Sequence, residues 1–252
     1  MTTFNRALSI AALGLALSFA NAAEATNLVT NGDFSTNGGG GQVGFNTTLN
    51  GWTLANSQSY TFLFGSGTQA TSGVTGQYGS LSLWGPGNGS QNGLTSSPAG
   101  GYFIAQDGAF QQAAMQQTIN GLVAGQNYAV SFYWAGAQQS GFTGATTEQW
   151  EVSLGGQNLY TSVVSDPSEG FSGWQYTTLT FTATSSSELL SFLSIGTPSG
   201  VPPFALLDGV SMTQVASAPE PASAAVMLTG LAGLMALVWY RRKAAKAVAG
   251  SR

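Results

Sequence analysis

The side chains that could carry chemistry in this chain are almost entirely carboxylates. The sequence contains ten Asp and Glu residues but no His and no Cys. Without imidazole or thiol groups, it offers no Ser–His or Cys–His nucleophile and lacks the ligands of the usual zinc sites. General acid–base chemistry would therefore depend on carboxylates or tyrosine alone.

Two local pairs of acidic residues are candidates for the paired carboxylates of a glycoside hydrolase or lyase. Glu148 and Glu151 are three residues apart, so on a strand their side chains point to opposite faces. Asp166 and Glu169 lie on either side of Pro167 in an apparent loop, where we expect solvated turn residues. A glycosidase needs two carboxylates that face each other across a cleft. Neither pair favours catalysis, and a carboxylate-dependent hydrolase or lyase is the alternative to a non-catalytic protein.

Tryptophan offers a different chemistry, because aromatic faces beside Asn, Gln and acidic groups are typical of sugar-binding sites. The indoles between the two ends of the chain are Trp52, Trp84, Trp134, Trp150 and Trp174. We assign Trp134 and Trp150 to the core, since aromatic residues at a period of two pack sheets together. Trp84 precedes Gly85 and Pro86 at the junction of a strand and a loop, and it is the candidate ligand-binding residue.

The placement of charge limits the partners of the protein. The six basic residues are terminal: Arg6, Arg241, Arg242, Lys243, Lys246 and Arg252. All ten acidic residues lie between Glu24 and Glu220, and the net charge is −4. A region without Lys or Arg cannot neutralise phosphates, so we expect no nucleic-acid binding. Anionic polysaccharides would be repelled, whereas neutral sugars and divalent cations are compatible with this charge.

The N-terminal residues 1–22 have the pattern of a signal peptide. Arg6 supplies the positive region, the apolar run extends from Ala7 to Ala20, and Ala20 and Ala22 are the small residues of a cleavage site. The apolar run is too short to span a bilayer. We therefore predict a cleaved export signal.

The C-terminal region predicts a transmembrane-type helix. The stretch from Ala222 to Tyr240 carries no charge, and as a helix it would be about 28 Å long, close to the hydrocarbon thickness of a bilayer. Trp239 and Tyr240 fit an aromatic belt, and the basic cluster that follows predicts a cytoplasmic tail over residues 244–252.

The segment 218–243 resembles the PEP-CTERM sorting signal of Gram-negative bacteria. The resemblance rests on the tripeptide, the apolar helix and the basic cluster, formed here by Pro219, Glu220, Pro221, Arg241, Arg242 and Lys243. It implies a tail that is recognised by an exosortase at the inner membrane, with export to the cell surface or the extracellular matrix. The extension from Ala244 to Arg252 departs from tails that stop soon after their arginines.

The middle of the chain predicts an all-β domain over residues 27–215. Apolar and polar residues alternate most clearly in Tyr128 to Trp134, Trp150 to Leu154 and Leu189 to Ile195. Further candidate strands cover residues 28–30, 60–64, 81–84, 102–106, 115–119, 158–164, 175–183 and 209–215. Turns rich in Gly, Asn and Ser separate them. This pattern favours an antiparallel β-sandwich of the jelly-roll type.

Short motifs in this domain resemble galactose-binding-like jelly rolls, including carbohydrate-binding modules. They are Asn27 to Phe34, Gly51 to Thr53, Gly125 to Tyr128 and Leu207 to Val210. The resemblance implies a structural Ca²⁺ where the first and last strands meet, with Asp33 and Asp208 as the matching positions. Ser35 stands where an acidic residue is common in the family. The alternative is that Asp33 makes a turn and Asp208 caps a strand end.

These patterns together predict a non-catalytic exported protein of the cell surface or extracellular matrix. Its β domain would bind neutral glycans such as an exopolysaccharide, or it would be a purely structural component of a biofilm matrix. Saturable binding to a glycan separates these two functions, and turnover of a glycan would indicate the hydrolase or lyase.

Overall fold

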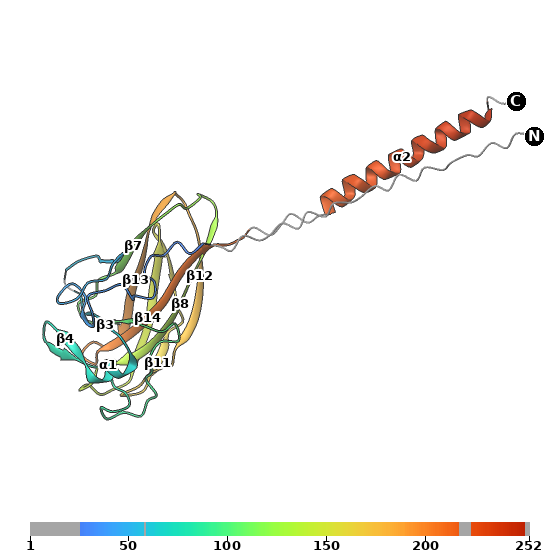
Figure 1. The fold of residues 1–252 in the computed structure, drawn as a ribbon. Helices are drawn as coiled ribbons and strands as arrows, with labels where there is room; N and C mark the ends of the chain where they lie inside the picture. Colours follow the sequence, from blue (N-terminus) through green and yellow to red (C-terminus); the bar gives the residue numbers. More distant parts are fainter. Residues whose placement is uncertain (1–25, 58, 217–222, 250–252) are drawn as a thin grey trace, which may run out of the picture.

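The computed structural model describes residues 26–57, 59–216 and 223–249, with the side chains of the C-terminal helix described over residues 230–243. These residues form a β domain and a separate helix (Figure 1). The predicted signal peptide at 1–22 lies outside the described residues, as do Pro219, Glu220 and Pro221 of the sorting motif.

Six strands form the first sheet, in the order β1-β3-β6-β14-β8-β12, and every neighbouring pair is antiparallel. Their bounds are β1 Gly41–Gln42, β3 Thr61–Phe64, β6 Phe103–Asp107, β8 Asn127–Gln138, β12 Gln175–Thr182 and β14 Pro203–Gln214. The two longest strands, β8 and β14, pair along most of their length, with a register shift between Asp208 and Ser211.

The second sheet has the order β10-β9-β13-β7-β2, and β11 also pairs with β9. The bounds are β2 Thr53–Leu54, β7 Met115–Asn120, β9 Thr146–Leu154, β10 Gln157–Tyr160, β11 Val164–Asp166 and β13 Ser187–Thr197. All of these pairs are antiparallel. Every second residue of β9 is buried, because one face of this sheet packs against the first sheet.

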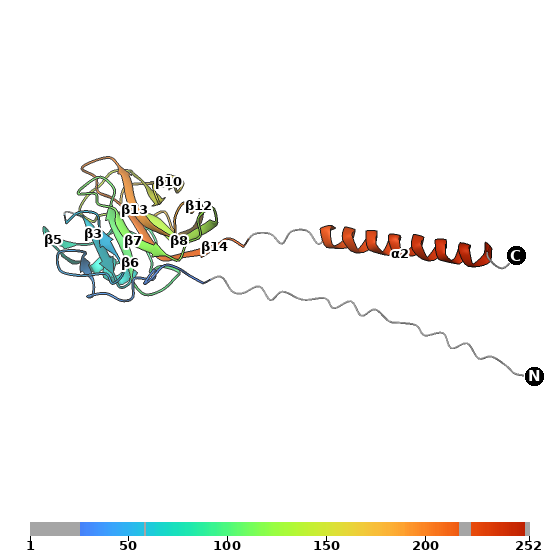
Figure 2. The ribbon, with the colours of Figure 1, turned by 90° about the horizontal axis from the view of Figure 1, so that it is seen from above.

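The predicted antiparallel sandwich is confirmed, and three of the shorter predictions are wrong in detail. Of the predicted strand 81–84, only Leu81 lies in a strand, and Leu83 forms an isolated bridge with Gln139. Residues 28–30 do not form a strand, yet the N–H of Leu28 donates to the carbonyl of Met212 at 2.8 Å and that of Val210 to the carbonyl of Gly32 at 2.9 Å. The predicted strand at 158–164 is divided between β10 and β11. The first and last segments of the domain therefore lie side by side (Figures 1 and 2).

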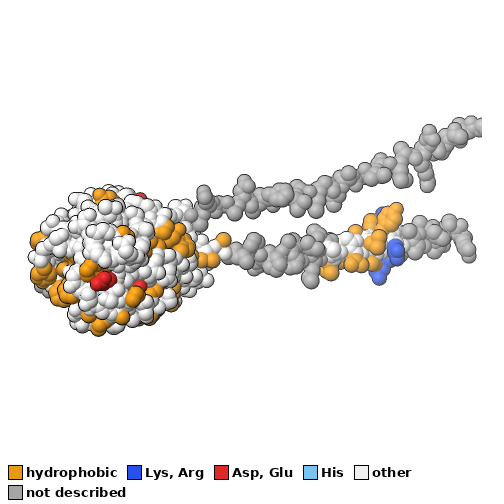
Figure 3. Space-filling model, turned by 90° about the horizontal axis from the view of Figure 1, so that it is seen from below, with side chains coloured by type: hydrophobic (Ala, Val, Ile, Leu, Met, Phe, Trp, Pro, Cys, Tyr) orange, Lys and Arg blue, Asp and Glu red, His pale blue; other side chains and the backbone are white. Residues whose placement is uncertain are grey.

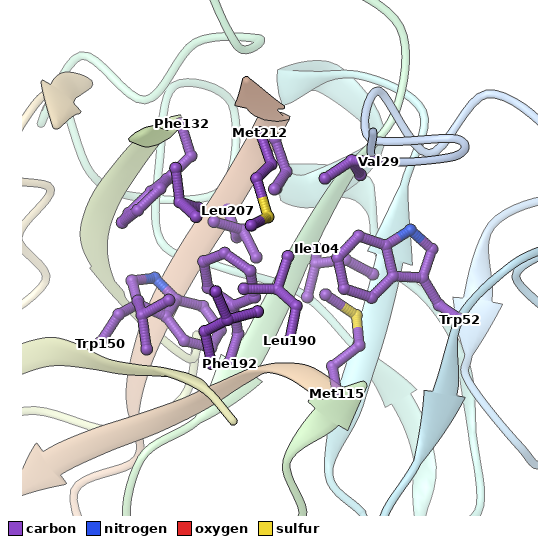
Figure 4. Packing of buried hydrophobic residues seen from close by; sticks show 14 of the residues in the cluster. Val29, Trp52, Ile104, Met115, Phe132, Trp150, Leu190, Phe192, Leu207 and Met212 are labelled. Atoms are coloured by element: carbon purple, nitrogen blue, oxygen red, sulfur yellow. The ribbon is translucent and has the colours of Figure 1, made fainter. Parts of the chain in front are cut away.

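The main core fills the space between the two sheets (Figure 4). The Phe192 ring makes edge contacts with Trp52, Phe132 and Trp150 at centroid distances of 6.1, 5.2 and 6.1 Å. Trp150 is fully buried, and its Nε1 donates to the carbonyl of Leu206 at 3.0 Å. Trp134 is also fully buried. The prediction that Trp134 and Trp150 are core residues is confirmed.

A third, partial layer covers the outer face of the first sheet. It consists of α1 Gly67–Ser72 and the hairpin of β4 Val74–Gly76 and β5 Gly79–Leu81. A second apolar cluster lies beneath it, including Phe62, Phe64 and Phe103. This cover explains why every residue of β3 and β6 is buried, since an open sheet face would expose alternate side chains.

The C-terminal helix α2, Ser223–Ala249, confirms the predicted helix and continues through the basic cluster Arg241 to Lys243 into the predicted tail. Among the described residues, no helix is both long enough and apolar enough to cross a membrane. The prediction of a membrane-spanning segment is therefore not supported.

We expect Phe192→Ala to lower the free energy of unfolding by about 3–5 kcal/mol, because it leaves a cavity at the centre of the main core. Leu189→Ala on the same strand is the matched control, since Leu189 is 43% exposed, and it should cost under about 1 kcal/mol. Denaturant unfolding of both variants measures the difference. Equal losses would show that the core is not centred on Phe192.

Candidate functional site

One end of the sandwich carries a pocket of about 430 Å³, which we call the loop-end pocket. The start of β3, the end of β6, the loop after β8 and the loop between β13 and β14 meet there, and the β4–β5 turn closes one side. Antiparallel pairing brings these strand ends together. The lining consists of Tyr60, Tyr78, Ser80, Asp107, Ala109, Phe110, Gln139, Phe142, Ser199, Gly200 and Pro202.

Aromatic rings form the walls of the loop-end pocket. Tyr60, Tyr78 and Phe110 contact one another, with centroid distances of 5.4 Å for Tyr60–Phe110 and 6.1 Å for the other two pairs. Tyr60 is buried, whereas Tyr78 is 65% and Phe110 46% exposed. Phe142 lies on the loop after β8 and is 39% exposed. Large exposed aromatic residues that gather around a hollow are typical of a ligand site.

Asp107 is the charged group of this pocket. Its side chain is 1% exposed, and its Oδ1 accepts the N–H groups of Ala109 at 2.8 Å and Phe110 at 3.1 Å. Its Oδ2 is buried and has no hydrogen-bond partner. Burial raises the pKa of Asp107 to about 6, although the two N–H groups lower it. The lining therefore includes a carboxylate with one oxygen that no protein group donates to.

The chain around Asp107 is held by backbone contacts. The N–H of Asp107 donates to the carbonyl of Tyr60 at 3.0 Å, and that of Tyr60 donates to the carbonyl of Gln111 at 3.0 Å. Gly108 lies so close to the β13 end that a Cβ there would be 2.4 Å from the nitrogen of Gly196. The Asp-Gly pair thus ends β6 and fixes the carboxylate at the rim of the sandwich.

Trp84, the residue that the sequence singled out for ligand binding, lies beside the pocket and is not among its lining residues. Its ring is half-buried, and its Nε1 donates to the carbonyl of Phe142 at 2.7 Å. Its backbone N–H donates to the carbonyl of Gln138 at 2.9 Å. Trp84 therefore supports the loop that carries Phe142, and direct contact of its ring with a ligand stays a prediction.

Sequence reasoning missed Tyr60, Tyr78, Asp107 and Phe110. They belong to three separate parts of the chain, and only the fold brings them together. One sequence signal was present: Asp107 and Gly108 directly follow a predicted strand at 102–106, and such a turn pair places a carboxylate at a strand end.

Asp33 and Asp208 are the predicted calcium ligands. Burial raises the pKa of Asp208 to about 7, and the nearby charge of Asp33 makes a smaller contribution in the same direction. Asp208 is fully buried and its Oδ2 has no partner, whereas Asp33 is exposed and accepts the N–H of Ser35 at 3.3 Å. An orphaned carboxylate oxygen beside a second carboxylate suits a hard cation. The two residues fit a Ca²⁺ ion, and its binding stays a prediction.

Of the two acidic pairs considered for catalysis, one is arranged as expected and the other is not. Glu148 points into the sandwich and is fully buried, while Glu151 is half-buried on the other face of β9, so these two do not pair. Asp166 was expected to be a solvated turn residue, and this is wrong: it ends β11, is 3% exposed and faces Glu148. Neither Glu148 nor Asp166 lines the loop-end pocket. Asp107 is the only carboxylate among the described residues of its lining.

The surface of the described β domain carries few charges. In Figure 3 its visible face is mostly uncharged, with isolated carboxylates, and the basic side chains appear on α2. This agrees with a sequence that has no Lys or Arg between Ala7 and Tyr240. The loop-end pocket therefore has no basic group with which to attract an anion.

No family model matches the chain. A curated relative, halomucin of Haloquadratum walsbyi, is 29% identical over 230 residues, or 90% of this chain. The chain spans about 2% of the length of that relative.

The neighbours of the chain among solved structures include carbohydrate-binding modules. A CBM4 domain is 15% identical with a TM-score of 0.36, and the match covers 74% of this chain and 99% of that one. The CBM22-1 xylan-binding domain of Paenibacillus barcinonensis Xyn10C is 12% identical with a TM-score of 0.37, over 79% and 100%. The active domain of bacteriophage CBA120 tailspike protein 4 is 13% identical with a TM-score of 0.35, over 75% and 21%. TM-scores below 0.5 give these likenesses no weight for the function, which depends on the residues of the site.

We expect Asp107→Asn to flatten the pH dependence of stability between about pH 4 and pH 6. The raised pKa of Asp107 means that the folded state favours the protonated acid. Its contribution to stability is complete below the unfolded pKa and is lost as the pH rises through about 6. The loss is of order 2 kcal/mol, and denaturant unfolding at several pH values measures it. Glu151→Gln removes the same charge from a half-buried position and should keep the wild-type slope; equal slopes in all three proteins would contradict the assignment.

Proposed function

We propose that the loop-end pocket binds a neutral glycan without catalysis. The observation that carries this proposal is that Asp107, whose Oδ2 has no hydrogen-bond partner in the protein, lines a pocket walled by Tyr60, Tyr78 and Phe110. A sugar offers the two complementary features: hydroxyl groups that donate hydrogen bonds and apolar C–H faces that cover aromatic rings.

The aromatic walls suit a sugar ring in shape and exposure. The exposed rings of Tyr78 and Phe110 gain by losing water contact when an apolar face covers them. Tyr78 is also oriented, because its hydroxyl accepts a hydrogen bond from Nε2 of Gln111 at 2.8 Å. A ring that is already held loses little conformational entropy when a ligand binds.

Asp107 would fix the orientation of the glycan. A sugar hydroxyl that donates to Oδ2 satisfies an acceptor that is otherwise buried and unpaired, and a hydrogen bond to an ionised group stabilises a complex by about 1.5–3 kcal/mol. Gln139 lines the same pocket and adds an amide that can both donate and accept. Because the pKa of Asp107 is about 6, affinity should fall as the pH drops below that value.

The charge of the domain favours a neutral ligand over an acidic one. No described residue of the pocket is basic, and Asp107 would repel an anionic sugar such as a uronic acid. A neutral exopolysaccharide chain end or branch fits these constraints.

We expect Tyr78→Ala and Asp107→Asn each to weaken glycan binding about tenfold or more, through loss of ring contact and of the charged acceptor respectively. A neutral-glycan array followed by calorimetry with the best ligand measures the loss. Tyr176→Ala is the matched control, because Tyr176 is 59% exposed on β12, away from the pocket, and it should bind as the wild type does.

Three results would contradict this proposal. Saturable binding that both pocket variants retain would place the site elsewhere. The absence of saturable binding to any neutral glycan would favour a purely structural matrix protein. Release of shortened sugars by the wild type would indicate the hydrolase or lyase.

We also propose that the protein is exported, with the β domain at the cell surface or in the extracellular matrix of a Gram-negative bacterium. The support is the signal-peptide pattern at 1–22 and the resemblance of 218–243 to a PEP-CTERM tail. An exosortase-type enzyme would be the processing partner.

The intact mass of the extracellular protein from its native host tests this proposal. We expect a chain that begins after Ala22 and ends near Pro219 to Pro221, because both signals would be removed during export. Peptide mapping of the C-terminus locates the cut. A full-length chain through Arg252 that is found only inside cells would contradict both export and processing.

A further inference from the structure

Two carboxylates face each other inside the sandwich, away from the loop-end pocket. Strand β11 pairs with β9 so that Asp166 lies opposite Thr146 and Val164 opposite Glu148. Glu148 is 0% and Asp166 3% exposed. Both reach the opposite sheet at Gly136 of β8, where a Cβ would lie 2.5 Å from Oδ2 of Asp166 and 2.6 Å from Oε2 of Glu148. The two acidic groups therefore share one small space that a side chain at position 136 would fill.

Several oxygen atoms in this space have no hydrogen-bond partner. They are both carboxylate oxygens of Glu148, Oδ2 of Asp166 and Oγ1 of Thr146. The Thr146 side chain is 2% exposed and lies on the same face of β9 as Glu148. Its hydroxyl lies close to the Glu148 carboxyl and lowers the pKa of Glu148, against the larger effect of burial, which raises it. A buried neutral hydroxyl thus points at the same place as the two acids.

No described residue of the β domain can neutralise this pair. The chain has no His, and it has no Lys or Arg between Ala7 and Tyr240. Burial raises the pKa of both Glu148 and Asp166, which reflects the cost of a buried charge without a counter-ion. The pair must therefore take up protons or a cation from solution.

We propose that Glu148, Asp166 and Thr146 form a binding site for a divalent cation, with Ca²⁺ as the best match. Two carboxylates balance the charge of a divalent ion, and all the available ligands are oxygen atoms, which Ca²⁺ prefers. Mg²⁺ demands a near-ideal octahedron and keeps several of its waters. An enclosed site between two sheets suits it less.

A cation here would fasten β11 and the loop after it to the body of the domain. This loop reaches the loop after β8, because Oγ of Ser168 accepts the N–H of Gly144 at 2.9 Å and the N–H of Glu169 donates to Oε1 of Gln138 at 2.6 Å. The ion would thereby stabilise the segment that leads to Gln139 and Phe142.

The test is made on the full chain after removal of metal with a chelator. Thermal unfolding is followed with CaCl₂, with MgCl₂ and with neither, and native mass spectrometry counts the bound ions. We expect CaCl₂ to raise the Tm of the wild type and of the charge-matched control Glu151→Gln. The double variant Glu148→Gln/Asp166→Asn should fold, show no such rise at this site and bind one Ca²⁺ fewer.

Asp208→Asn separates this site from the predicted calcium site at Asp33 and Asp208. If the double variant keeps the full Ca²⁺ response while Asp208→Asn loses it, the ion binds elsewhere and the proposal is overturned. If Ca²⁺ does not change the wild-type Tm and only pH does, the pair shares a proton, which also overturns the proposal.

Thr146→Val keeps the test decisive if the double variant does not fold. The substitution preserves the shape of the side chain and removes only the hydroxyl. We expect it to fold and to weaken Ca²⁺ binding at this site about tenfold. Wild-type affinity in this variant would show that the hydroxyl is not a ligand and would overturn the proposed site.

Discussion

The β domain must fold without a single basic side chain, and this constraint decides where each acidic group lies. No ion pair can compensate a buried carboxylate, so each uses another means. Asp107 accepts two backbone N–H groups at the end of β6. Glu188 accepts from both the N–H and hydroxyl of Thr184 and the N–H of Ser185, and these bonds lower its pKa although burial raises it. Glu148 and Asp166 lie close only to each other and to the Thr146 hydroxyl. For that reason they form the proposed cation site.

The same constraint shapes the remainder of the architecture. With few charges available, the domain excludes water by apolar packing on both faces of its first sheet, where α1 and the β4–β5 hairpin add a partial third layer. That layer also supplies Tyr78, whose ring forms one wall of the loop-end pocket against Tyr60 and Phe110. The pocket thus forms where the extra layer meets the strand ends and the loops after β8 and β13.

The sequence predicts the regular part of this structure and little of its long-range part. Alternation identifies β8, β9 and β13, because each has one face on the core, and it places Trp134 and Trp150 correctly. It reaches only the first residue of β11, a strand of three residues whose existence depends on pairing with β9. Asp166 consequently looks like a loop residue in the sequence although it is buried. The glycine-rich sequence after Trp84 predicts an exposed ligand-binding residue. The walls of the pocket come instead from residues that only tertiary contacts bring together.

Strand β14 starts beside the loop-end pocket, at Pro203, and ends at Gln214, next to the segment that leads to the C-terminal helix. It is paired on both sides, with β8 and with β6. If a ligand in the pocket and the C-terminal tail are pulled apart, the force runs along the length of this strand. The cross-strand hydrogen bonds then bear the load together, in shear, and do not open one after another as in a zipper. Strand β14 would therefore make the domain a mechanically strong link between a ligand in the loop-end pocket and an anchor on the C-terminal tail.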